Sequence, residues 1–311
     1  MEQEINGYRL LAPFTTAGAG SARWTFAEKD GEEYFLKEFL SPVYPVDSTP
    51  MPDGVRARRK AQCAEYEKTK NELYRAIARA DNGNIVSVSE FFRNEDNYYI
   101  VTRRVEGSAI TADKACDLPG DRIKVMVRTL VHSLLQLERA GVVHADLKPT
   151  NIMLKPTVNG FFSLKLIDFD GSFFVSSPPQ DCEELQGDPV YLSPEMFLAM
   201  RGESVPLTSK IDVFAAGLII HEMFTGRLPG FPAEYDYPFE AVLEGAELAL
   251  DEKMPDEYRR LIPDMLRAEP DARPGFEEIF AYLTGAPARK PAGNAEKSAE
   301  AGRWLRPAGQ L

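Results

Sequence analysis

One short segment, residues 144–151, carries side chains that could handle a proton, an anion and a metal ion. It reads His144-Ala145-Asp146-Leu147-Lys148-Pro149-Thr150-Asn151. The carboxylate of Asp146 could orient a hydroxyl nucleophile, and the ammonium of Lys148 could neutralise a phosphate. The amide oxygen of Asn151 is a hard ligand of the kind that Mg²⁺ prefers. A polar turn after a helix could also hold these residues, so the interpretation depends on the flanking segments.

A second candidate metal ligand follows an apolar strand. Asp168-Phe169-Asp170 comes directly after Lys165-Leu166-Ile167. An aspartate at such a position is costly to bury without a cation. We therefore expect Asp168 to bind Mg²⁺ rather than to cap the end of the strand.

Composition and charge limit the classes of function. The 311 residues suffice for about two folding units, and the net charge of −12 disfavours nucleic acid and anionic membranes as partners. Cys63, Cys116 and Cys182 have neither disulfide-like nor metal-like spacing, which predicts reduced thiols in a cytoplasmic protein. The start of the chain has no basic and apolar leader, and the longest apolar run, Val213–Ile220, is too short to span a bilayer.

In the N-terminal third of the chain, apolar and polar residues alternate as they do in β-strands. We predict strands over Tyr8–Phe14, Arg23–Glu28, Glu33–Phe39, Ile85–Phe92 and Asn97–Arg103, with a long helix over Val55–Ala80 before the last two. Gly18 and Gly20 would let backbone amides close over phosphates, although a simple hairpin turn would use them equally well. Lys37 lies in the third strand.

The rest of the chain is predicted to be mainly helical. Apolar residues recur at helical spacing over Asp121–Ala140, and Ile211–Phe224 is apolar nearly all round, which indicates a buried helix. A hairpin of Ile152–Leu154 and Ser163–Ile167 separates them. From residue 286 the chain is rich in Ala, Pro, Gly, Lys and Glu, and we expect a linker or tail there.

In this order the motifs resemble those of protein kinases over about residues 8–283. The catalytic loop of that family, H-R-D-x-K-x-x-N, is matched at His144, Asp146, Lys148 and Asn151, with Ala145 in place of arginine. The D-F-G motif is matched with Asp170 in place of glycine. The G-x-G-x-x-G loop is matched at Gly18 and Gly20, with Arg23 at the third glycine.

The resemblance implies roles for further residues. Lys37 would contact the α- and β-phosphates of ATP, and a helix glutamate, Glu72 in preference to Glu65, would pair with it. Thr102 would limit the depth of the ATP pocket, and the backbone of Arg103 to Val105 would bind adenine.

The resemblance also covers Gly171–Ser193, the loop expected to bind or gate the substrate. Residues 187–195, with Glu195 at their end, look like the family's G-T-P-x-Y-x-A-P-E, and Arg273 would pair with Glu195. Asp212 would cap the backbone of the catalytic loop. Asp188 replaces a threonine and could reach Lys148, which leaves the choice between Ser/Thr and Tyr acceptors open.

The fold implied is α+β and bilobal. A small five-stranded antiparallel N-lobe with one main helix would occupy residues 1–105, a mostly helical C-lobe residues 106–285, and a flexible tail residues 286–311.

The function implied is an ATP- and Mg²⁺-dependent protein kinase that phosphorylates a hydroxyl of a protein substrate, including itself. Arg23 and Asp170 keep open a nucleotide-binding pseudokinase that acts as a scaffold, whereas the segment 187–195 disfavours a kinase of small molecules. Ala145, Asp170 and Asp188 also resemble a bacterial branch found in tellurite-resistance gene neighbourhoods, which implies a von Willebrand-type domain protein and a PP2C-type phosphatase as partners.

Overall fold

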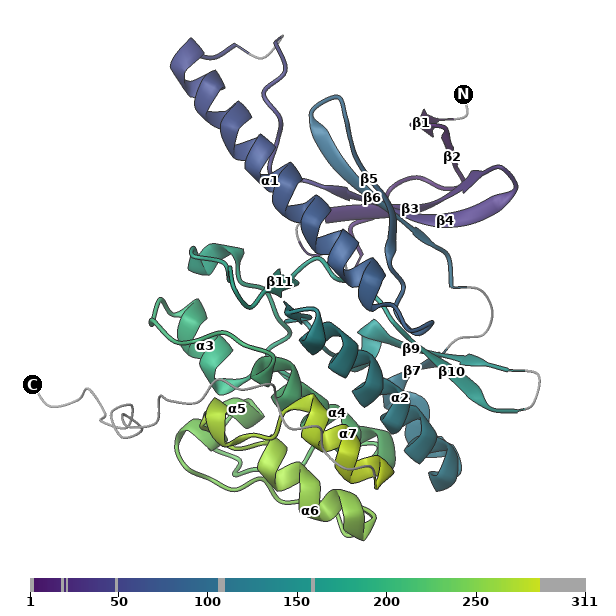
Figure 1. The fold of residues 1–311 in the computed structure, drawn as a ribbon, viewed down its shortest axis with the longest axis vertical. Helices are drawn as coiled ribbons and strands as arrows, with labels where there is room; N and C mark the ends of the chain where they lie inside the picture. Colours follow the sequence, from purple (N-terminus) through teal and green to yellow (C-terminus); the bar gives the residue numbers. More distant parts are fainter. Residues whose placement is uncertain are drawn as a thin grey trace, which may run out of the picture.

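The computed structural model describes residues 3–17, 20, 22–47, 50–105, 110–157 and 160–285. A β-sheet with one long helix forms the smaller lobe, and a mostly helical body forms the larger lobe (Figure 1). The predicted α+β class with two lobes is therefore confirmed. The predicted tail, residues 286–311, lies outside the described residues.

The smaller lobe is built on a six-stranded antiparallel sheet. Its order is β1-β2-β3-β4-β6-β5. The strands are β1 (Glu4–Ile5), β2 (Tyr8–Leu10), β3 (Ala22–Lys29), β4 (Glu32–Phe39), β5 (Val88–Asn94) and β6 (Asn97–Arg103). The predicted count of five was wrong because β1, which pairs with β2, has only two residues and so shows no alternation.

The β3–β4 hairpin turns at Asp30-Gly31, where both residues have positive φ (55° and 79°), as a tight hairpin turn requires. Its register sets Trp24 opposite Lys37 and Arg23 opposite Glu38. Because neighbouring side chains on a strand point to opposite faces, Arg23 lies on the face of the sheet away from Lys37.

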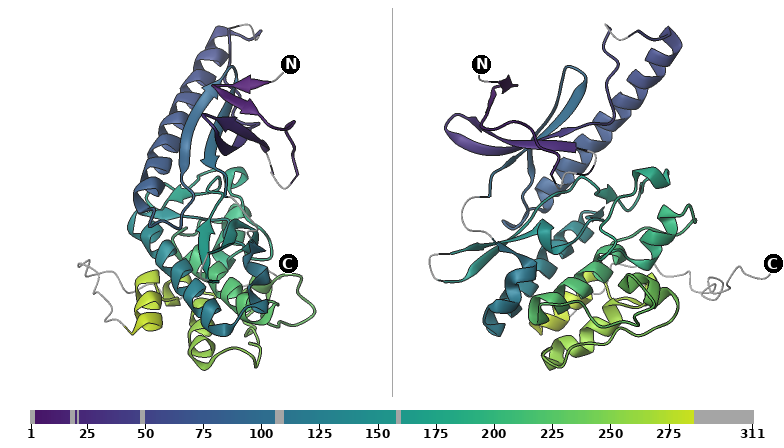
Figure 2. Two further views of the ribbon diagram at one scale, coloured as in Figure 1. Left: turned by 90° about the vertical axis from the view of Figure 1, so that its right-hand side faces the viewer. Right: turned by 180° about the vertical axis from the view of Figure 1, so that it is seen from behind.

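Helix α1 (Asp53–Ala80) packs its C-terminal half against the sheet and the larger lobe, and its N-terminal half extends past the sheet (Figures 1 and 2). Its buried side chains gather on one face, at Cys63, Leu73, Tyr74, Ala76, Ile77 and Ala80. Their spacing of three and four residues is that of an amphipathic helix. This face sets which charged residues of α1 can reach the site.

The larger lobe surrounds two buried helices, α2 (Gly120–Arg139) and α4 (Lys210–Thr225). The predicted all-round burial of α4 is confirmed, since twelve of its residues are buried. Around them lie α3 (Pro194–Met200), α5 (Pro238–Leu243), α6 (Asp256–Met265) and α7 (Phe276–Thr284). Four short 3₁₀ helices complete the described part of this lobe: η1 (Ala112–Asp117), η2 (Pro149–Asn151), η3 (Cys182–Glu184) and η4 (Pro270–Ala272).

Two small sheets carry the site loops. Strands β10 (Phe162–Leu166), β9 (Ile152–Pro156) and β7 (Ile110–Thr111) form one, and β11 (Phe173–Phe174) pairs with β8 (Val142–Val143) in the other. The backbone of Leu166 bonds both Val86 (2.8 Å) and Asn84 (2.7 Å), so β10 ties the segment after α1 to the larger lobe. No helix in the described ranges is long and apolar enough to cross a membrane.

Candidate active site

Asp212 of helix α4 holds the loop that contains Asp146. The carboxylate of Asp212 accepts the backbone N–H of His144 at 2.7 Å and that of Ala145 at 3.0 Å. Burial raises the pKa of Asp212, and His144 with the two amide bonds opposes this rise. Ala145 has φ +66°, a left-handed conformation that costs about 1 kcal/mol for a residue with a Cβ. The predicted contact of Asp212 with the loop is confirmed.

Asp146 lies within a set of polar side chains from its own loop. Its Oδ2 accepts a hydrogen bond from the Asn151 amide at 3.1 Å and pairs with the Lys148 ammonium at 2.9 Å. Its other oxygen, Oδ1, is buried and has no hydrogen-bond partner among the described residues. One oxygen is thus fixed by the protein, and the other keeps its acceptor capacity unused.

Asn151 and Asp168 are brought side by side by the backbone. The N–H of Ile167 donates to the carbonyl of Asn151 at 3.0 Å, and Asp168 follows with φ +63°. The Asn151 amide nitrogen donates to the carbonyl of Asp146 at 2.8 Å, which leaves its amide oxygen for another partner. An amide oxygen beside a carboxylate suits Mg²⁺.

These two ligands fit a magnesium ion that waters and substrate phosphates also hold. Among the described residues no group of three or more His, Cys, Asp or Glu side chains could hold a metal ion. Mg²⁺ usually keeps several waters and binds substrate phosphates beside one or two carboxylates. The donor set of this chain matches that pattern.

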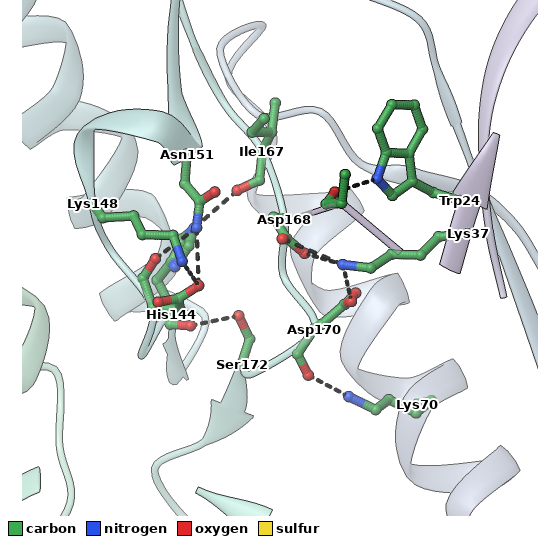
Figure 3. A network of polar contacts seen from close by, with 12 residues as sticks. Trp24, Lys37, Lys70, His144, Lys148, Asn151, Ile167, Asp168, Asp170 and Ser172 are labelled. Atoms are coloured by element: carbon green, nitrogen blue, oxygen red, sulfur yellow. Dashed lines mark hydrogen bonds and ion pairs between the residues drawn. The ribbon is translucent and has the colours of Figure 1, made fainter. Parts of the chain in front are cut away.

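Lys37 reaches the site from β4 (Figure 3). Its side chain is only 7% exposed, and its ammonium is 3.0 Å from Asp168 Oδ1. It is also in ion-pair contact with Oδ2 of Asp170. Burial by itself would lower the pKa of Lys37, but Asp170 and Asp168 together raise it. The lysine is therefore held charged between two carboxylates.

The predicted partner of Lys37 on α1 was wrong. Glu72 is exposed on α1, and the carboxylate partners of Lys37 are Asp168 and Asp170. Glu72 directly precedes the buried pair Leu73 and Tyr74, so its side chain points away from the packed face. The residue of α1 that reaches the site is Lys70, whose ammonium donates to the carbonyl of Asp170 at 2.8 Å. Burial lowers the pKa of Lys70.

The predicted nucleotide-binding residues are placed as follows. Gly18 lies outside the described residues, and Gly20 has φ +56°. Thr102 is half-buried opposite Phe35, on the same face of the sheet as Lys37. Arg103 is exposed and Val105 half-buried at the end of β6. Their roles toward a nucleotide stay predictions.

Sequence reasoning missed an aromatic group on this face of the sheet. The rings of Trp24 and Phe35 lie 5.3 Å apart, and that of Phe26 lies 5.5 Å from Trp24. The Trp24 indole N–H donates to the carbonyl of Ala17 at 2.9 Å, which ties Ala17 to β3. Alternation along β3 is the signal that could have placed Trp24 and Phe26 beside Lys37.

The segment of residues 187–195 is tied to the larger lobe. Arg273 and Glu195 form the predicted pair through two bonds of 2.8 and 2.9 Å, both fully within the core. The predicted contact of Asp188 with Lys148 was wrong. Asp188 Oδ1 accepts the N–H of Val190 at 3.0 Å in a turn of its own segment, and Lys148 pairs with Asp146.

The structure has the two lobes, and the loops of Asp146 and Asp168, that the resemblance to protein kinases implied. The protein kinase domain family matches residues 55–283, and the chain belongs to this family.

Proteins of similar sequence carry the name serine/threonine-protein kinase. GL21140 of Drosophila persimilis is 28% identical over 248 residues, which cover 75% of this chain and 31% of that protein. ULK3 of Xenopus laevis is 27% identical over 203 residues (64% and 42%). The kinase cds1 of Schizosaccharomyces pombe is 26% identical over 238 residues (72% and 50%). The chain thus spans about a third to a half of the length of these relatives.

Proposed function

We propose that this chain is an active protein kinase that transfers the γ-phosphate of ATP to a hydroxyl of a protein. The observation that carries the proposal is the asymmetry of Asp146. Its Oδ2 is held by Asn151 and Lys148, whereas its buried Oδ1 has no partner among the described residues. A hydroxyl that donates to Oδ1 would be oriented for attack and could give up its proton there.

The surrounding charges suit this reaction because phosphoryl transfer depends on positioning and charge neutralisation. Lys148 lies beside Asp146 and would face the transferred phosphate. Lys37 would face the α- and β-phosphates, with Gly18 and Gly20 in the loop above them. Bound Mg²⁺ would neutralise phosphate charge, and Asn151 with Asp168 would hold it.

The remaining predicted residues would hold the base of ATP. We propose that Thr102 limits the depth of its pocket and that the backbone of Arg103 and Val105 bonds the adenine edge. The backbone N–H of Arg104 donates to the carbonyl of Glu33 at 3.2 Å. This bond supports the placement, because it fixes the backbone between Arg103 and Val105.

We propose serine or threonine as the acceptor. The relatives named above are serine/threonine-protein kinases by name. Autophosphorylation would present such a side chain from a second copy to Asp146.

The direct test uses labelled ATP with Mg²⁺ and a generic protein acceptor. Wild-type protein should transfer label, and Asp146→Ala should lower the rate at least about a hundredfold, within the range known for positioned acid–base groups. Unchanged transfer in Asp146→Ala would contradict the assignment. Mass spectrometry of both purified proteins should find phosphoserine or phosphothreonine only in the wild type, and phosphotyrosine would contradict the acceptor class.

The narrower context is part of the same proposal. Ala145, Asp170 and Asp188 support a bacterial kinase of the tellurite-resistance type, with a von Willebrand-type domain protein and a PP2C-type phosphatase as partners, and the spacing of the three cysteines supports a cytoplasmic location. Mixing the kinase with each purified partner class and ATP would test this. Phosphorylation of the first and reversal by the second are expected, and equal labelling of an unrelated acidic protein would contradict a dedicated pair.

A further inference from the structure

In the kinase motifs a helix glutamate pairs with the strand lysine, and a glycine ends D-F-G. Here the helix residue at the site is a lysine, Lys70, and the loop residue in place of that glycine is Asp170, which pairs with Lys37. We propose that Asp170 is the residue that positions Lys37, and that Lys70 of α1 positions Asp170. The inference rests on the proposed kinase function, because it concerns the lysine expected to contact the phosphates of ATP. Figure 3 shows Lys37 between Asp168 and Asp170, with Lys70 on the far side of Asp170.

Lys37 has two carboxylates, but only one can serve it throughout the reaction. Asp168 contacts the ammonium at 3.0 and 3.3 Å and is also the proposed metal ligand. Once Asp168 turns to a metal ion, Asp170 is the carboxylate that remains beside the ammonium. Asp170, whose side chain is 16% exposed and pairs with Lys37, can then orient the ammonium toward the phosphates.

Lys70 fixes the backbone that carries Asp170. Its ammonium donates to the Asp170 carbonyl at 2.8 Å, across a distance of 100 residues in sequence. The aliphatic part of Lys70 lies on the packed face of α1, one turn before Leu73 and Tyr74. A shift of α1 would therefore move Asp170 and, through it, Lys37.

The glutamates of α1 near this level have other surroundings. Glu72 is exposed, Glu65 is exposed and pairs with Lys68 at 3.9 Å, and Glu67 accepts the Tyr98 hydroxyl at 2.7 Å. Because Lys70 occupies the helix position that faces the loop, a carboxylate for Lys37 has to come from the loop itself. Asp170 supplies it where related kinases have glycine.

The first experiment compares single variants by steady-state kinetics with Mg²⁺-ATP. Asp170→Asn removes the charge at constant shape, and Lys70→Gln removes the ammonium. Each should lower kcat/KM for ATP at least about tenfold, equivalent to about 1.4 kcal/mol. The matched control is Lys68→Gln, an exposed lysine on the same helix, which should stay within about twofold. A larger loss in Glu72→Gln than in Asp170→Asn would overturn the inference.

The second experiment moves the carboxylate back to the helix. Asp170→Gly alone leaves Lys37 without its lasting partner, and Lys70→Glu alone sets a second carboxylate beside Asp170. The double variant, Asp170→Gly with Lys70→Glu, offers Lys37 a helix-borne carboxylate. It should recover activity at least about fivefold above the better single variant. A double variant no better than the additive loss would overturn the proposed coupling.

Nucleotide binding separates this inference from the proposed function. Affinity for Mg²⁺-ATP, from the rise in melting temperature on titration, should fall in the single variants and recover in the double variant. The melting temperature without ATP shows whether each variant folds. If the wild type transfers no phosphate but affinities follow this order, the inference stands and the kinase assignment fails. If the wild type transfers phosphate and neither rate nor affinity follows the order, the inference alone fails.

Discussion

At the scale of single residues, two residues of the site hold strained backbone conformations. Ala145 and Asp168 both adopt positive φ, and neither is glycine. Backbone strain of this kind persists only where the surroundings over-determine it. Asp212 does so for Ala145 through its backbone bonds, and the Asn151–Ile167 bond sets the residue before Asp168.

The pair of Glu195 and Arg273 gives a stability prediction. Both side chains are almost fully buried, at 4% and 0% exposure. Glu195→Ala would leave the Arg273 charge in the core without its carboxylate, which should lower the free energy of unfolding by about 3–5 kcal/mol. Chemical denaturation measures this loss.

The control for that prediction is another arginine–carboxylate pair of the same lobe. Arg267 and Asp264 are both more than half exposed. Asp264→Ala should change the free energy of unfolding by less than about 1 kcal/mol, because surface pairs contribute little. Similar losses in the two variants would show that Glu195 does not neutralise a buried charge.

The residues that could be predicted from the sequence are those whose geometry is local. Asp146, Lys148 and Asn151 lie within one loop, so their order nearly fixes their contacts. The prediction that Glu72 pairs with Lys37 was wrong because Lys37 lies on a strand distant in sequence. The choice of Glu72 rested only on its spacing from the strand that follows the helix. The apolar face of α1 was in the sequence, since Leu73, Tyr74 and Ile77 align with residue 70 and not with 72.

At the scale of elements, periodicity predicted the long helices to within one or two residues, as α2 and α4 show. It could not find β1, whose two residues carry no pattern. Nor could it place Asp188, whose carboxylate bonds the backbone two residues ahead. Short-range turn bonds of this kind compete with every long-range contact that a sequence motif suggests.

The C-terminal end of α4 carries a pH-dependent contact. His221 is buried, its Nε2 accepts the N–H of Asp251 at 3.0 Å, and its Nδ1 lies 2.8 Å from the carbonyl of Arg227. This pattern fits the neutral ring. Burial lowers the pKa of His221, while the Arg227 carbonyl and Asp251 partly oppose the shift.

The sign of the effect follows from proton counting. As pH falls through the ordinary histidine range, near 6.5, the unfolded chain binds a proton that folded His221 does not. Stability should therefore fall between pH 7.5 and 5.5, and this fall should be smaller in His221→Gln. Melting temperatures of both proteins across that range measure it. An equal fall in the two would mean that other groups set the acid sensitivity.

At the scale of the whole molecule, the segment of residues 171–195 is anchored at both of its ends. β11 pairs with β8, and Val175 N–H donates to the Gly141 carbonyl at 2.9 Å. At its other end the Tyr191 hydroxyl donates to Glu222 at 2.6 Å, and Glu195 is held by Arg273. These contacts order the segment without the predicted bond between Asp188 and Lys148.

The charges around this segment argue against control by a phosphate on it. In kinases with arginine before the catalytic aspartate, a phosphate on this segment neutralises that cation. Here Ala145 removes the cation, and the exposed side chains near Ser176 and Ser177 include Asp181, Glu183 and Glu184. In a chain with a net charge of −12, a phosphate there would meet more repulsion than attraction.

We therefore expect activity to be independent of phosphorylation in this segment. Phosphatase-treated protein should keep its initial rate within about threefold of untreated protein, measured after the phosphatase is removed. The Ser176→Ala and Ser177→Ala variants serve as controls, since they rule out phosphate that survives treatment and should behave like the treated wild type. A loss of more than about tenfold, equivalent to about 1.4 kcal/mol in the barrier, would show that a phosphate is needed and that another cation has replaced the arginine. Lys148 would be the first to examine, because it is the only lysine or arginine of residues 144–151.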